Sequence, residues 1–131
     1  MSWCFCKILS DRKDEIVLEN DLAFAVYDIA PVSKGHLLIV PKRHVETYFD
    51  ASRDEINACL NLMERAKVML DKQFQPDGYN IGINVGAVAG QTVMHLHIHL
   101  IPRYEGDQKD PRGGIRSVIP EKKLGNMKGL I

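Results

Sequence analysis

The stretch His95-Leu96-His97-Ile98-His99-Leu100-Ile101 decides how this chain is interpreted. Histidines and aliphatic residues alternate in it, and side chains along a β-strand alternate between the two faces of the sheet. We therefore expect a strand over residues 92–101 with its three imidazoles on one face. Its aliphatic side chains would pack against a helix on the other face, and neighbouring imidazoles would lie roughly 6–7 Å apart.

A purely structural role is the weaker explanation for this cluster. Five histidines occur in the chain, and three buried rings would need partners for all their nitrogens. One functional interpretation is a metal site built from neutral imidazoles, although no Asp or Glu lies between Asp77 and Glu105. The other is nucleophilic attack on phosphorus, because an ordinary imidazole is largely neutral at pH 7. His97, with a histidine on each side, is then the expected nucleophile.

The residues that lead into this stretch favour an anionic ligand. Gly86 and Gly90 would let backbone amides approach a phosphate closely. Gln91 and Thr92 add polar groups, and Val93 completes the approach to the strand. A plain glycine turn between two strands would explain the same residues, so this segment alone proves little.

The rest of the chain predicts an α+β fold. Ser52 and Glu55 form a capping box at the start of a helix over residues 53–74, which carries one apolar stripe. Alternating or apolar runs predict further strands over residues 15–19, 22–28, 36–40 and 79–85. We expect an antiparallel sheet of about five strands with the long helix packed on one face.

Size and charge indicate a single soluble domain over residues 1–131, with a core over about 5–103 and an irregular tail over 104–131. Seventeen basic residues balance 17 acidic ones, which gives no electrostatic reason to expect a nucleic-acid partner. No apolar run is long enough for a membrane span. Three cysteines without a secretory leader predict reduced thiols and a cytoplasmic location.

Two blocks of the chain resemble the histidine triad (HIT) family. The segment from Gly90 to Arg103 is similar to its signature, in which three histidines alternate with apolar residues. A second block, Tyr27 to Pro31 followed by Lys34 to His44, resembles the N-terminal pattern of the family. The likeness runs from about Phe5 to Arg103, and the segment from Asp110 to Gly114 is similar to tails of prokaryotic members.

This resemblance implies a nucleotide hydrolase or transferase that acts at an α-phosphate through a nucleotidyl-histidine intermediate. His97 would be the nucleophile, His99 and His95 would orient it and contact the phosphate and leaving group, and His36 would support the tautomer from behind. Substrates would be dinucleoside polyphosphates or nucleoside phosphoramidates. Members are usually homodimers whose sheets join, and the chemistry requires no cofactor.

The resemblance also implies a nucleotide-binding set. Asp28 would accept from the ribose hydroxyls, Asn84 would bind phosphate or sugar, and Gln91, Thr92, Val93 and His99 would line the phosphate and leaving-group site. Other roles stay open, because Asp28 could be a turn acid and His36 a core histidine. The alternative functions are a non-catalytic nucleotide-binding regulator on the same fold and a metal-dependent hydrolase that uses His95, His97 and His99.

The N-terminus departs from some prokaryotic members, in which Cys-x-x-Cys and two histidines bind a structural zinc. Here the segment reads Trp3-Cys4-Phe5-Cys6, so the first cysteine position is Trp3 and Cys4 is out of register on a strand. Only Cys6, His44 and His95 keep the matching positions. Three ligands fall short of a closed tetrahedral zinc site, so we expect no metal.

Overall fold

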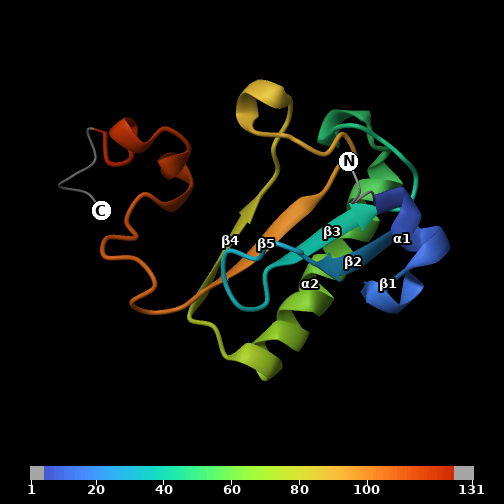
Figure 1. Ribbon diagram of the computed structural model, residues 1–131, viewed down its shortest axis with the longest axis horizontal. Helices are drawn as coiled ribbons and strands as arrows, with labels where there is room; N and C mark the ends of the chain where they lie inside the picture. Colours follow the sequence, from blue (N-terminus) through green and yellow to red (C-terminus); the bar gives the residue numbers. More distant parts are fainter. Residues whose placement is uncertain (1–4, 126–131) are drawn as a thin grey trace.

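The computed structural model describes residues 5–125 and contains the predicted α+β fold. Its five-stranded antiparallel sheet has the order β1-β2-β3-β5-β4. Two helices pack against the sheet, and α2 has the predicted bounds (Figure 1). The elements are α1 (Phe5–Asp11), β1 (Ile16–Glu19), β2 (Ala23–Tyr27), β3 (Leu37–Pro41), α2 (Arg53–Phe74), β4 (Gly78–Gly82) and β5 (Ile98–Arg103).

The long helix α2 covers one face of the sheet. Its capping box forms as predicted: the Ser52 hydroxyl accepts from the Glu55 N–H, and the Glu55 carboxylate accepts from the Ser52 N–H. Leu62 and Leu70 of the helix are buried against β2, β3 and β5. The strand residues in this core are Ala23, Ala25, Leu37, Ile39, Ile98 and Leu100. Packing against α2 therefore fixes which face of β5 is apolar.

The short helix α1 covers part of the opposite face, and we did not predict it. Phe5 and Ile8 are buried against Phe24 and Val26 of β2 and against β3. A seven-residue helix is too short to show a helical repeat in the sequence, whereas its two apolar side chains three positions apart suit one helical turn. Cys6 therefore lies on a helix, so the strand geometry assumed for this segment is wrong. Trp3 and Cys4 lie outside the described residues.

Two predicted strands extend three or more residues beyond one end of the observed strand. The strand predicted over 92–101 begins only at Ile98, because the N–H of Leu96 donates to the carbonyl of Val45 at 2.8 Å, outside the ladder. The strand predicted over 79–85 ends at Gly82, and the chain then enters a loop. The loop over residues 83–97 therefore connects β4 to β5 and contains His95 and His97, whereas His99 lies in β5.

The tail returns over β4 and contains two short 3-10 helices, Gly114–Val118 and Pro120–Lys122. A Cβ built on Gly82 would lie 3.7 Å from the Cδ1 of Ile115, and one on Gly114 would lie 3.4 Å from the Nδ2 of Asn80. Gly82 and Asn80 lie opposite His99 and Ile101 in the ladder, so they share the face away from α2. Figure 1 shows the tail beside β4.

Within residues 5–125, no helix is both long enough and apolar enough to cross a membrane.

Candidate active site

The histidines and the aliphatic residues between them face opposite sides, as predicted, although only His99 lies within β5. Leu96 packs with Val45 and Ile56 of α2, and Ile98 and Leu100 belong to the core under the same helix. His95 and His97 instead contact the ring of Phe5 in α1, with ring centroids 5.6 and 5.1 Å away. The three imidazoles therefore lie on the side of the sheet away from α2.

His97 is held in one tautomer by the main chain. Its Nδ1 lies 2.8 Å from the carbonyl oxygen of His95. A carbonyl can only accept a hydrogen bond, so Nδ1 must carry the proton. The lone pair is then on Nε2. Because the ring is only half-buried, Nε2 is the nitrogen available to a ligand.

A hydrogen-bonded chain of two further histidines lies beside this ring. The N–H of Val32 donates to Nδ1 of His36 at 3.1 Å, so Nε2 of neutral His36 carries the proton. That nitrogen lies 2.9 Å from Nδ1 of His99, which must accept. Nε2 of His99 therefore carries a proton, and the rings of His97 and His99 have centroids 5.1 Å apart. The arrangement pairs an unprotonated nitrogen on His97 with a donor on His99.

Burial keeps the hydrogen-bonded rings of His36 and His99 neutral. Desolvation lowers the pKa of His99 from 6.5 to about 4, with additional repulsion from His97 and His36 and a smaller opposing effect of Asp28. Burial also lowers the pKa of His36, against the attraction of Asp28, whose Oδ2 lies 3.5 Å from the His36 Nε2. A protonated His99 would lose Nδ1 as an acceptor for His36. The neutral form is the one that the hydrogen bonds require.

These shifts predict a pH-dependent stability. The folded protein protonates His99 only near pH 4, whereas the unfolded chain does so near 6.5. The unfolded state therefore binds more protons in that window, and stability falls as the pH drops through it. We expect the melting temperature to be lower at about pH 5 than at about pH 7, with a flatter profile for His99→Gln. A melting temperature that rises on acidification would contradict this.

The ring of His95 is buried, and its predicted contact with the phosphate or leaving group remains a prediction. The imidazole is 1% exposed, and its Nε2 donates to the carbonyl oxygen of Pro41 at 2.9 Å. Its Nδ1 faces Sγ of Cys6 at 3.5 Å. Both ring nitrogens of His95 therefore face groups of the protein. His95 orients His97 through its main-chain carbonyl.

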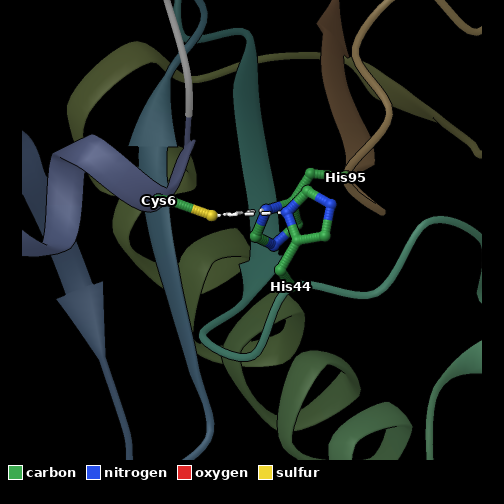
Figure 2. A group of neighbouring side chains, drawn as sticks. All are labelled: Cys6, His44 and His95. Carbon is green, nitrogen blue, oxygen red and sulfur yellow. Dashed lines mark hydrogen bonds between the residues drawn. The ribbon is translucent and has the colours of Figure 1, made fainter.

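The three predicted zinc residues do come together. Sγ of Cys6 lies 3.3 Å from Nδ1 of His44 and 3.5 Å from Nδ1 of His95, and all three atoms lie within 4.8 Å of one another. Figure 2 shows Cys6 reaching from α1 toward both imidazoles. Because Nε2 of His95 donates to Pro41, its Nδ1 has the lone pair that a metal needs. The donors fit zinc as three of four ligands, and no fourth His, Cys, Asp or Glu joins them within residues 5–125.

The alternative metal site on His95, His97 and His99 is not supported by the geometry. In the described part of the chain, His95 groups with Cys6 and His44, whereas His99 groups with Asp28 and His36. His97 belongs to neither group. In the second group, Nε2 of His36 and Nδ1 of His99 are hydrogen-bonded to each other at 2.9 Å, and this bond occupies the lone pair on Nδ1 of His99.

The predicted nucleotide-binding residues have different surroundings. Oδ1 of Asp28 accepts from the N–H of Ala30 at 2.9 Å, as a turn acid does, while its other oxygen faces His36. Asn84 is half-buried after β4, with its amide beside Gly90. Thr92 is exposed and Val93 packs at the edge of the core under α1.

Gln91 is occupied by the loop itself. Its side chain is 3% exposed. Oε1 accepts from the N–H of Gly86, and Nε2 donates to the carbonyls of Glu46 and Val93. This amide therefore closes the loop over residues 86–91 and ties it to the segment after β3. The prediction that it also lines the phosphate site remains a prediction.

Sequence reasoning overlooked Phe5, which is buried against the rings of His95 and His97. An isolated aromatic residue near an N-terminus has no periodic signal. A Phe and an Ile three residues apart, ahead of a charged segment, were the available hint.

The sheet, the helix α2 and the paired His97 and His99 define a histidine triad domain. The pattern of the HIT domain matches residues 10–106, and the chain belongs to the HIT family. An uncharacterised HIT-like protein of Methanocaldococcus jannaschii is 39% identical over 95% of this chain and 98% of its own. A bis(5′-adenosyl)-triphosphatase of Dictyostelium discoideum is 38% identical over 73% of this chain and 64% of its own. A HIT family protein from Bacillus anthracis superimposes with a TM-score of 0.74 at 35% identity, covering 81% of this chain and 77% of its own.

Proposed function

We propose that this protein hydrolyses dinucleoside polyphosphates or nucleoside phosphoramidates at the α-phosphate and releases a nucleoside monophosphate. The observation that supports this most is the 2.8 Å hydrogen bond from Nδ1 of His97 to the carbonyl of His95, because it leaves Nε2 unprotonated. A relative of 38% identity is a bis(5′-adenosyl)-triphosphatase, which cleaves this class of substrate.

In the first step, Nε2 of His97 attacks the α-phosphorus and forms an N–P bond. The bond from that phosphorus to the leaving group breaks, and the leaving group takes the electron pair. The His97 ring becomes cationic, and the carbonyl of His95 stabilises it by accepting from Nδ1. For bis(5′-adenosyl) triphosphate the leaving group is ADP, whose departing oxygen receives a hydrogen bond from Nε2–H of His99.

In the second step, water attacks the same phosphorus and the N–P bond breaks. His97 regains its lone pair on Nε2, AMP is released, and the proton of the water passes to solvent. Asp28 would accept from the ribose, and Asn84 and Thr92 would contact the phosphate. Val93 and Gln91 hold the loop that presents these groups.

Turnover of a substrate panel tests this function. We expect AMP release from both bis(5′-adenosyl) triphosphate and adenosine 5′-phosphoramidate, because both place an α-phosphorus next to a leaving group. Chromatography of the products at several time points would measure it. The alternative, a nucleotide-binding regulator, predicts saturable binding of AMP with negligible release from either compound.

The proposed reaction requires no metal, since the nucleophile and the donor are both imidazole nitrogens. Cys6, His44 and His95 would hold a zinc ion structurally, and the ion would link α1 to the loops around it without supplying a reacting group. We expect dialysis against a chelator, checked by metal analysis, to leave AMP release within about twofold. A rate that falls with metal content and returns when zinc is added would contradict this.

We also propose a homodimer that extends the sheet. β4 ends the strand order, so its outer edge is unpaired by the other strands of the sheet. Ile81 on this strand and Val68 on α2 are 49% and 58% exposed. Pairing of the β4 edges of two protomers would cover the unpaired strand edge and the exposed side chains of Ile81 and Val68. Sedimentation equilibrium would distinguish dimer from monomer.

A further inference from the structure

The main chain that carries His97 lies outside the sheet. The strand β5 begins at Ile98, so residues 95–97 belong to the loop before it. Leu96 ties this loop to the rest of the protein, because its N–H donates to the carbonyl of Val45 and its side chain packs beside α2. Loops are more mobile than the strands they connect. The imidazole of His97 therefore depends on side-chain contacts for a fixed orientation.

The hydrogen bond of this imidazole does not by itself supply that orientation. It joins Nδ1 of His97 to the carbonyl of His95, so both of its ends lie on the same loop. The ring also has two aromatic neighbours, Phe5 and His99, each with its centroid 5.1 Å away. His99 lies in the next strand, two residues along the chain. Phe5 is the neighbour that comes from a different element, the helix α1.

The ring of Phe5 contacts both residues of that hydrogen bond. It meets the His95 ring edge-on, with centroids 5.6 Å apart and an angle of 81° between the planes. It meets the His97 ring at a tilt of 48°. Tilted and edge-on pairs at these separations are the favourable arrangements of aromatic rings. One side chain therefore holds the residue that accepts the hydrogen bond and the ring that donates it.

The sheet fixes Phe5 in place. A seven-residue helix is not stable alone, so the position of α1 depends on the burial of Phe5 and Ile8. Phe5 is 0% exposed, and a side chain without exposed surface has no face to offer a nucleotide. Its effect on a reaction must therefore pass through the histidines. The strand residues buried with it are Phe24, Val26, Leu38 and Val40.

We propose that Phe5 is a positioning residue for the nucleophile. Its ring keeps Nδ1 of His97 on the carbonyl of His95, so that the lone pair stays on Nε2. Without this ring, the imidazole can turn away from the carbonyl and carry its proton on Nε2, the atom that must attack phosphorus. The inference rests on the proposed function and deepens it by adding a residue that does not touch the substrate.

Kinetics of Phe5→Leu test this role, because leucine keeps an apolar side chain and removes the ring. We expect kcat for AMP release from bis(5′-adenosyl) triphosphate to fall about tenfold, since small displacements of a reacting group cost up to about 100-fold. KM should change less than about twofold, because Phe5 is closed to the substrate. Steady-state kinetics on the full-length protein would measure both quantities.

Nuclear magnetic resonance of the imidazole nitrogens tests the same role without substrate. In protein labelled with ¹⁵N-histidine, the two ring nitrogens give different signals when protonated and unprotonated. At about pH 8, where an ordinary imidazole is neutral, we expect His97 of the parent protein to carry its proton on Nδ1 alone. Phe5→Leu should add a population protonated on Nε2. Comparison with His97→Ala assigns the signals.

Phe24→Leu is the matched control, because it makes the same change in the same buried cluster. Phe24 lies in β2 and is 0% exposed, and among residues 5–125 its ring contacts no histidine ring. Both variants should melt a few degrees below the parent protein, whereas Phe24→Leu should keep kcat and the single tautomer. If Phe5→Leu does not fold, Phe5→Met replaces it with an expected loss of about threefold, because methionine still packs on a ring.

The outcomes separate this inference from the proposed function. A loss of kcat confined to Phe5→Leu, together with the second tautomer of His97, supports the inference. Equal losses in Phe5→Leu and Phe24→Leu would overturn it, and so would a single unchanged tautomer in Phe5→Leu; neither result affects the proposed function. A parent protein that releases no AMP would overturn the proposed function, and the tautomer of His97 in Phe5→Leu would then decide the inference alone.

Discussion

His97→Ala is expected to reduce AMP release from bis(5′-adenosyl) triphosphate on the order of 10⁴-fold, because it removes the atom that bonds to phosphorus. The loss should appear in kcat, since the ring acts on the reacting phosphorus and AMP binding rests on other residues. Steady-state kinetics with both substrates of the panel would measure it. Adenosine 5′-phosphoramidate should lose a similar factor, because the same nitrogen attacks in both reactions.

His44→Ala is the matched control for this change. It removes another imidazole, but one that is exposed and lies beside His95 and Cys6. We expect it to retain turnover within a few-fold, and both variants to melt near the parent protein. Turnover of His97→Ala above about a tenth of the parent rate would contradict the role of this ring.

Leu100→Ala is expected to give the largest loss of stability, about 2–5 kcal/mol. Leu100 is 1% exposed at the middle of β5, between Leu37 of β3 and Ile81 of β4 in the ladder, and it packs under α2. Truncation would leave a cavity where the strand that carries His99 meets the helix. Thermal unfolding should show a fall in melting temperature of roughly 10 °C.

Leu22→Ala makes the same chemical change at a surface position. Leu22 lies in the turn between β1 and β2 and is 39% exposed, so its truncation should cost less than about 0.5 kcal/mol. Similar losses from the two variants would mean that the core under α2 does not dominate stability.

The fold was largely predictable because its strongest signals are local. The capping box of Ser52 and Glu55 and a long amphipathic pattern give α2 its bounds. Apolar or alternating runs identify the strands, and packing against one helix favours an antiparallel sheet. The start of β5 was predicted wrongly because alternation also persists through Leu96, whose N–H bonds to Val45 outside the ladder. Alternation reports which side a side chain faces and carries no information about its backbone partner.

The sequence predicts which residues form the site better than it predicts the contacts that those residues make. The pattern and the resemblance to the HIT family indicate His36, His97 and His99, and the structure connects these three. The position of the His95 ring depends on the carbonyl of Pro41 and on Cys6 of α1, both distant in sequence. The sequence of the tail does not indicate the hollow of about 820 Å³ beside it, because the walls of that hollow come from the segment before β3, the sheet and the tail, which only the folded chain brings together.

The most direct measurement is peptide mapping by mass spectrometry of protein that has been rapidly quenched during turnover of bis(5′-adenosyl) triphosphate. The account predicts an adenylyl group on the peptide that contains His97, located on that ring by fragmentation and absent from His97→Ala. An adenylyl group on another residue would contradict the account. Turnover without any covalent adduct would also contradict it, because water would then attack phosphorus directly, with inversion.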